Sequence, residues 1–459
     1  MGGMAREETR TSTSTRIRRT PMRRTPPGGP VAGDGAHPSP RAWTARLLMA
    51  GIVLAALNLR PAITSLGALL EEVRDGLGMS AGLAGLLTSV PPLCFAVFGI
   101  TAPRLARRFG PAAVVCAGMA AIAAGLLIRP YAGGTAGFVA ASALALMGIA
   151  VSNVLMPVIV KRHFPDRVGS MTGLYSMALA LGTSTAAAVT VPMTDALGGS
   201  WRTGLAVWAG LAAAALLPWL PFVRRRREPG TRAGGTGAGA ENTARTAPAA
   251  AAPGATEDPA ARPPLPITRS RTAWALAVFF GLQATAAYIT MGWMAQIFRD
   301  AGVPAATAGL LLAVTMVMGV PLSFVIPRLA TRLPRQGPIV VALGVCGLAG
   351  YAGLYLAPAA GAWAWALLLG ISNCAFPLAL TMVGMRARTG AGVVRLSAFA
   401  QSTGYLISIP GPLLVGVLYQ HSGGWGLPLA LMAALMIPQT VVGVLAGRDR
   451  TVEDETAAR

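Results

Sequence analysis

Twelve predominantly apolar stretches recur along this chain, and they restrict its fold more than any other feature. A helix needs roughly 20 apolar residues to cross the hydrocarbon core of a bilayer. Only 12% of the residues are charged, against roughly 25% in soluble domains. We therefore predict an all-α integral membrane protein with twelve transmembrane helices. Hydropathy places these spans approximately at 46–70, 80–101, 111–129, 134–160, 167–192, 202–223, 272–296, 305–327, 337–357, 360–384, 394–419 and 425–446.

Two sets of six spans flank a polar segment at 224–271. It begins RRRREPG and continues through Ala, Gly, Pro, Thr and Arg, a composition that cannot bury a core and predicts a disordered linker. No apolar h-region precedes the first span, so a cleavable signal peptide is not expected. The predicted order is a disordered basic tail at 1–43, a six-helix bundle at 44–223, the linker, a six-helix bundle at 272–447 and a C-terminal tail at 448–459.

Basic residues follow the even-numbered spans, whereas the loops after odd-numbered spans hold few of them. Because Lys and Arg in short loops stay on the cytoplasmic side, both termini and the linker are predicted to be cytoplasmic, in a multi-pass protein of the cell membrane. The formal charge of +21 is then a topology signal rather than a sign of nucleic-acid binding. Five arginines lie in loops that we expect to act in cytoplasmic gating: Arg104, Arg107, Arg108, Arg328 and Arg332.

The two halves repeat one another in parallel. PRLARRFGP at 103–111 matches PRLATRLP at 327–334, and SNVLMP at 152–157 matches SNCAFP at 372–377. Two six-helix bundles related by a pseudo-two-fold axis along the membrane normal are the organisation of the major facilitator superfamily (MFS fold). In such transporters the substrate site lies between the halves near the midplane.

Within that superfamily the chain resembles the cyanate and 2-nitroimidazole transporter (CynX/NimT-like) family. The resemblance covers nearly all of the chain outside the tail and linker. It rests on LNLRPAITSLGALLEEVRDGLGMS (57–80), AGLLTSVPPLCFAVFGITAPRLARRFG (84–110), FPDRVGSMTGLYSMALALG (164–182) and FFGLQATAAY (279–288). It implies a transporter of a small solute. The chain departs from the wider superfamily at Pro103 and Arg104, where an acidic residue is usual, so an Asp–Arg lock in this loop is not expected.

Arg60 lies in the middle of the first span, where a charge costs roughly 2.5–3.5 kcal/mol on insertion scales. A guanidinium without a carboxylate partner is a ready site for an anion. We therefore interpret Arg60 as a contact for the solute or for gating. The alternative is that it caps a backbone carbonyl, such as that of Leu57, freed by Pro61. The nearest acidic residues lie at span ends: Glu71, Glu72, Asp75, Asp195 and Asp300.

Polar side chains are nearly absent from spans 3, 6, 9 and 12, which we expect to face lipid, and gather in spans 1, 4, 5, 7, 10 and 11. That division predicts a central cavity, although each polar residue singly is as well explained by helix packing. The predicted substrate-binding residues are Arg60, Asn153, Tyr175, Gln283, Tyr288, Asn373, Gln401 and Tyr405. Helix packing or hinge roles are predicted for Asn58, Pro61, Pro157 and Pro377.

These features predict a secondary transporter that moves a small anionic, cyanate-like solute by alternating access. The lipid bilayer and the solute are the expected partners, and a monomer is expected. No cofactor, metal site or enzymatic activity is predicted, because the chain has no P-loop, no metal-ligand spacing and no clustered acids or histidines at membrane depth. One alternative is efflux of drugs or small heterocycles, which 6% aromatic residues disfavour. Another is a membrane receptor or signalling protein without transport.

Overall fold

The computed structural model describes residues 40–224 and 267–457, and residues from Thr44 onward form one compact unit. The predicted basic tail and the linker fall almost wholly outside the described ranges, and their predicted disorder stays a prediction. So do the domain boundaries proposed above.

Every secondary-structure element in these ranges is helical, and twelve helices are long and apolar enough to cross a membrane. Their ends lie within a few residues of the hydropathy windows, so the prediction of twelve spans is confirmed. The spans are Trp43–Ala68, Ala81–Gly99, Pro111–Tyr131, Thr135–His163, Ser170–Ala196, Trp201–Val223, Arg271–Asp300, Ala305–Arg332, Gly337–Leu356, Ala362–Met385, Gly392–Ser422 and Gly426–Ala446.

The helices of the first half precede the linker. They are α1 (Pro40–Asn58), α2 (Pro61–Ala68), α3 (Leu70–Leu77), α4 (Ala81–Phe109), α5 (Pro111–Ile128), α6 (Thr135–His163), α7 (Val168–Ala196), α8 (Trp201–Ala206), α9 (Trp208–Leu216) and α10 (Leu220–Arg224). Short 3-10 turns occur at Arg129–Tyr131, Pro165–Arg167 and Leu217–Trp219.

The second half begins with a 3-10 turn at Ile267–Arg269. Its helices are α11 (Arg271–Asp300), α12 (Ala305–Val317), α13 (Gly319–Arg332), α14 (Gly337–Leu356), α15 (Ala362–Asn373), α16 (Ala375–Met385), α17 (Gly390–Ser408), α18 (Pro410–Ser422), α19 (Gly426–Ala446) and the terminal α20 (Val452–Ala457).

Several spans are interrupted within the membrane. The first breaks between α1 and α2, where Pro61 starts a new helix, and the eleventh breaks where Pro410 starts α18. Proline suits a helix start because it lacks the N–H that would pair with the preceding turn. The eighth and tenth spans break at Met318 and Cys374, each a single residue between two helices.

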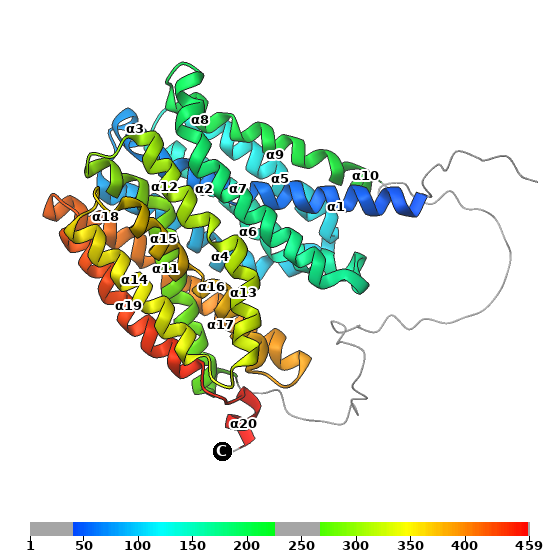
Figure 1. The fold of residues 1–459 in the computed structure, drawn as a ribbon. Helices are drawn as coiled ribbons and strands as arrows, with labels where there is room; N and C mark the ends of the chain where they lie inside the picture. Colours follow the sequence, from blue (N-terminus) through cyan, green and yellow to red (C-terminus); the bar gives the residue numbers. More distant parts are fainter. Residues whose placement is uncertain (1–39, 225–266, 458–459) are drawn as a thin grey trace, which may run out of the picture. The chain divides into compact units, whose positions relative to one another are not determined.

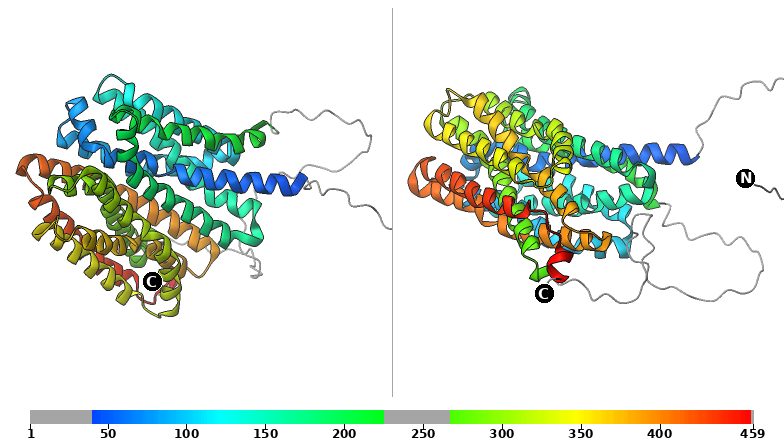
Figure 2. Two further views of the ribbon diagram at one scale, coloured as in Figure 1. Left: turned by 45° about the horizontal axis from the view of Figure 1, so that its top comes forward. Right: turned by 60° about the horizontal axis from the view of Figure 1, so that its bottom comes forward.

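The two halves meet chiefly along four helix pairs, α2 with α11, α4 with α17, α4 with α18 and α7 with α12. Glycines allow close approach there: a Cβ on Gly67 would overlap the Met291 carbonyl, and one on Gly416 would overlap the Ala81 carbonyl. Figure 1 and Figure 2 show α1–α10 gathered on one side and α11–α19 on the other. The seventh span is 72% buried, while the sixth and twelfth are each 33% buried, as expected for helices that face lipid.

Candidate functional site

A cavity of about 340 Å³ lies between the two halves, and we call it the main cavity. The first half supplies five of its lining residues and the second half supplies nineteen. Those of the first half are Arg60, Ser176, Leu179, Ala180 and Thr183. Those of the second half are Phe280, Gln283, Ala284, Ala287, Tyr288, Met291, Thr315, Met316, Gly319, Ser323, Pro327, Gly370, Asn373, Cys374, Phe376, Pro377, Leu380, Thr381 and Tyr405.

Arg60 supplies the positive charge of this cavity. It lies in the break between α1 and α2, with backbone angles outside the helical region, so its side chain is aimed independently of either helix. Its guanidinium carbon is 6.0 Å from the centre of the Phe95 ring. Tyr175, Tyr288 and Tyr405 lie close enough to interact electrostatically with Arg60.

The predicted alternative, in which Arg60 caps a carbonyl, finds no support among the described residues. The side chain of Arg60 forms neither a hydrogen bond to a backbone carbonyl nor an ion pair within them. A different arginine, Arg129, has that role: it donates to the carbonyl of Ala62 at 2.9 Å and to Ser65 Oγ at 3.4 Å. Arg60 therefore keeps donors available in a cavity without a carboxylate.

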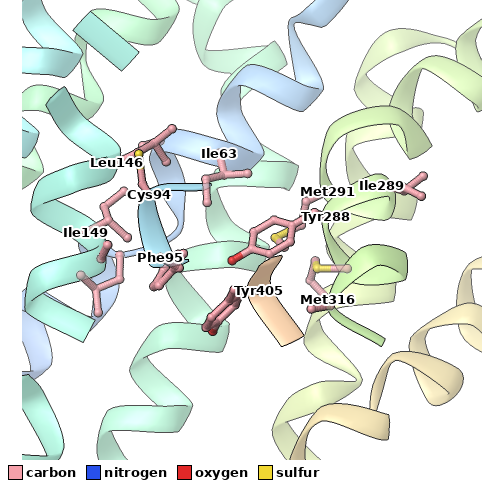
Figure 3. Packing of buried hydrophobic residues seen from close by; sticks show 14 of the residues in the cluster. Ile63, Cys94, Phe95, Leu146, Ile149, Tyr288, Ile289, Met291, Met316 and Tyr405 are labelled. Atoms are coloured by element: carbon pink, nitrogen blue, oxygen red, sulfur yellow. The ribbon is translucent and has the colours of Figure 1, made fainter. Parts of the chain in front are cut away.

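Aromatic rings surround this charge. Phe95 of the first half stacks on Tyr405 of the second at 5.0 Å and 20°, and Phe280 packs edge-on against Tyr405 at 5.3 Å. Figure 3 shows Phe95, Tyr288 and Tyr405 in the space between the ribbons of the two halves. Although the whole chain has few aromatic residues, several of them lie together at this site. The overall composition therefore does not argue against a cavity that binds a ring.

The structure brings five of the eight predicted substrate-binding residues to the main cavity: Arg60, Gln283, Tyr288, Asn373 and Tyr405. The other three lie beside it. The Tyr175 hydroxyl donates to Asn153 Oδ1, which ties these two residues to each other. Gln401 donates to Ser397 Oγ at 2.7 Å and does not line the cavity. The eleventh span, one of those in which polar residues gather, therefore contributes Tyr405 alone to the lining.

The residues predicted for packing or hinges occupy different environments. Asn58 donates to the carbonyls of Leu54 at 2.9 Å and Leu211 at 3.1 Å, so it joins the first span to the sixth. Pro61 starts α2, as expected, and Pro377 lines the cavity near the start of α16. Pro157 lies inside the unbroken α6. Their roles in movement stay predictions.

Sequence reasoning missed several lining residues, among them Thr183, Thr315 and Thr381. Each hydroxyl donates to a carbonyl four residues earlier in its own helix, at 2.7, 2.9 and 2.8 Å. A threonine in this local arrangement looks the same on a lipid face and on a cavity face. Only the rotation of each helix, which the sequence does not specify, separates the two cases.

One end of the main cavity is closed by contacts between the halves. Arg299 on α11 binds Glu71 Oε2 at 2.9 Å and both oxygens of Glu72 at 2.9 Å, and Gln296 donates to Glu71 at 3.4 Å. Asp300 accepts from Tyr419 and Trp425 at 2.7 Å each, within the second half. We call this the Glu71 end.

The opposite end carries the predicted gating arginines, and we call it the basic end. The cavity lining extends toward it as far as Pro327, next to Arg328, and Thr381. At this end every ion pair that joins two described residues lies within the second half: Arg386 with Asp449 and Arg388 with Asp454. Arg104, Arg107, Arg108, Arg328 and Arg332 are all exposed, and their gating role stays a prediction.

The chemistry of the site is that of a binding cavity. The guanidinium of Arg60, the two phenols of Tyr288 and Tyr405 and two carboxamides can bind a negative or electron-rich group, and the rings and methionines can hold a flat apolar body. In the part of the chain that the structure describes, no three His, Cys, Asp or Glu residues gather to hold a metal ion.

Comparison with known proteins identifies the family of this chain. The model of the Major Facilitator Superfamily matches residues 48–409. The chain belongs to the Major Facilitator Superfamily. It is a multi-pass membrane protein of a transporter family, and the predicted fold is confirmed. Among solved structures it is similar to the xylose transporter XylE from E. coli in an inward open conformation, with a TM-score of 0.65 and 10% identity over 90% of this chain and 99% of that one.

Curated relatives are similar over most of their length. An uncharacterized transporter of Bacillus subtilis, YycB, is 34% identical over 91% of this chain and 97% of its own. The 2-nitroimidazole transporter of Escherichia coli is 31% identical over 88% and 96%. The cyanate transport protein CynX of the same organism is 28% identical over 85% and 94%. The resemblance to the cyanate and 2-nitroimidazole transporters is thereby confirmed.

Proposed function

We propose that this superfamily member carries a small organic anion across the membrane by alternating access. The observation that carries the proposal is Arg60, a guanidinium that lines the main cavity and has no carboxylate partner among the described residues. An uncompensated charge at membrane depth is costly unless it faces a cavity or an anion. A monoanionic solute would neutralise it and accept hydrogen bonds from Arg60 and the neighbouring phenols.

The size of the cavity bears on the solute. A volume of about 340 Å³ is ample for an ion of three atoms, and it lies at the lower end of the roughly 300–1,000 Å³ range of small-molecule sites. The rings of Phe280, Tyr288 and Tyr405 line the cavity and can contact a flat ring. We therefore extend the proposal from cyanate-like ions to planar anions such as aromatic carboxylates.

Alternating access is supported by the asymmetry of the two ends. The halves are joined by Arg299, Glu71 and Glu72 at one end, and the lining residues continue toward the other. We propose that the basic end is cytoplasmic, because it carries the arginine-rich loops. The described conformation would then be the one that receives or releases solute on the cytoplasmic side.

Uptake into proteoliposomes tests the proposal. Labelled cyanate and labelled benzoate would be offered to the wild type, to Arg60→Gln and to Arg60→Lys. We expect the glutamine variant to lose at least about 90% of anion flux, because one charge-assisted bidentate contact is worth more than about 1.5 kcal/mol. The lysine variant should retain part of it, since the charge stays and the fork is lost. Normal anion flux in a folded Arg60→Gln protein would refute the anion site.

A second candidate is a neutral nitroheterocycle, favoured by the rings of Phe280, Tyr288 and Tyr405 in the lining. The same panel with labelled 2-nitroimidazole separates the two solutes. If 2-nitroimidazole flux persists in Arg60→Gln while benzoate flux is lost, the aromatic rings rather than the charge of Arg60 bind 2-nitroimidazole.

A further inference from the structure

A second and much smaller cavity lies within the second half. Its volume is about 10 Å³, and α11, α14, α15 and α19 form its walls. Gln283 and Asn373 line both this small cavity and the main cavity, so their side chains form the partition between the two. Any group in the small cavity that hydrogen-bonds to these amides therefore affects how they are oriented in the lining of the main cavity.

Two carboxamide oxygens are buried here without a partner. Gln283 on α11 is 3% exposed and Gln439 on α19 is 5% exposed, and both line the small cavity. Among the described residues no group donates a hydrogen bond to Oε1 of either side chain. Buried polar atoms are nearly always paired, because an unpaired one keeps its full desolvation cost. Because both residues line one small cavity, a single donor molecule there can serve both oxygens.

One water molecule meets that requirement. A cavity needs a volume of about 10–15 Å³ to hold one water molecule. Water has two O–H groups for the two acceptors, and it can accept from a wall hydroxyl such as that of Ser372. A metal cation fits less well, since no carboxylate lines the small cavity and the charge of Arg60 lies on the other side of the partition.

We propose that the small cavity holds one ordered water that links Gln283 to Gln439, and that Gln439 is thereby a positioning residue for the solute. With its oxygen held from behind, the Gln283 amide presents its nitrogen to the main cavity. That places an N–H donor in the same lining as Arg60 and Tyr288. The positioning role rests on the proposed transport function, whereas the bridge between the two glutamines does not.

A double-mutant cycle tests the bridge. Gln283→Met, Gln439→Met and the double variant keep side-chain volume while removing the amides. Because residues that share one hydrogen-bond network are not additive, we expect the double variant to lower the unfolding temperature by less than the sum of the two single changes. Met436→Leu, at an apolar wall residue of the same cavity, serves as the matched control. Additive effects within error would overturn the bridge.

Transport of benzoate tests the positioning role. Gln439→Met should raise the half-saturating concentration about three- to tenfold with little change in maximal flux, as the loss of one hydrogen bond predicts. In the Gln283→Met background the same change should have no further effect. A fall in maximal flux alone would show a structural role and overturn the positioning role.

The remaining outcomes are equally decisive. Wild-type flux that requires sodium, with the requirement abolished by Gln439→Met, would show a cation in the small cavity and overturn the water. If the wild type carries none of the probes, the proposed function fails, and the unfolding cycle still decides the bridge.

Discussion

The two halves repeat the same motifs, yet they differ in helix continuity. In the first half α4, α6 and α7 run unbroken for 29 residues each, and the span that breaks at the cavity is the first, beside Arg60. In the second half α11 runs unbroken for 30 residues, whereas the eighth, tenth and eleventh spans are each two helices. The sixth span is also divided, into α8, α9 and α10, so two spans are broken in the first half and three in the second, which supplies most of the lining.

That difference indicates that the two halves have different roles at the cavity. Gly319 and Asn373 flank breaks and line the cavity, so the second half can adjust its surface by small changes of backbone angle. The first half contributes the single charge of Arg60, and α4, α6 and α7 of this half are long and unbroken.

The largest expected effect comes from blocking the contact between the halves. In Gly67→Val the new side chain meets the Met291 carbonyl, which belongs to the backbone and cannot rotate away. We expect a cost of about 3 kcal/mol, at the upper end of the overpacking range, and therefore about a 100-fold loss of the conformation closed at the Glu71 end. Labelling of a cysteine introduced at Ser176, in a background without native cysteines, measures access from each side.

Gly210→Val is the control for that experiment, because a side chain at Gly210 meets no other atom within 4 Å. Unchanged labelling in Gly67→Val would show that the Gly67–Met291 contact does not close this end.

Restoring helix continuity in the second half should have the next largest effect. Pro410→Ala gives the eleventh span an N–H at its break, so α17 and α18 can join. We expect maximal flux to fall about fivefold without loss of thermal stability, as alanine is much the better helix former. Pro157→Ala, inside the unbroken α6, should leave flux near wild type. Equal effects of the two changes would contradict the division between the halves.

A smaller effect is expected at the closed end. Arg299→Gln removes the pairs to Glu71 and Glu72, and since these carboxylates are partly exposed the loss is about 1 kcal/mol, or roughly fivefold in the closed population. The same cysteine labelling reports it. Arg335→Gln, at the exposed basic end, should change nothing; an equal response from it would show that net charge rather than the Arg299 ion pairs is responsible.

The smallest effect concerns α20, which packs on the second half alone. Burial opposes ionisation of Glu455, but hydrogen bonds from Ser270 and Thr272 outweigh it and lower the pKa of Glu455 below its ordinary value. Because the pKa of Glu455 is lower in the folded state, its ionised carboxylate stabilises the docking of α20 at pH values above the unfolded-state pKa. This stabilisation is lost as the pH falls through the folded-state pKa.

We therefore expect Glu455→Gln to speed trypsin cleavage at Arg448 and Arg450 at neutral pH, about twofold to fivefold, with the exposed Asp75→Asn as control. The wild type should become equally sensitive only in acid, followed with an acid-active protease. Unchanged cleavage of Glu455→Gln would separate α20 docking from this carboxylate.

The sequence predicted the helices well because apolar length is a local property. It also predicted Arg60, since a mid-span charge is visible without a fold. The breaks at Pro61 and Pro410 lie at prolines, although Pro157 does not break α6. The break at Met318 has no such signal. Gln401 and Asn153 face neighbours rather than the cavity because helix rotation, which depends on tertiary packing, decides what a polar residue meets.

The unpaired charge of Arg60 also sets the electrical character of the proposed cycle. Without a counter-ion among the described residues, Arg60 places one positive charge within the membrane field of the empty carrier, and a bound monoanion cancels it. The membrane voltage then acts on the return of the empty carrier and not on the loaded step. A charge that crosses the whole field gains or loses roughly 2.3 kcal/mol per 100 mV, so the voltage would set how fast the empty carrier resets.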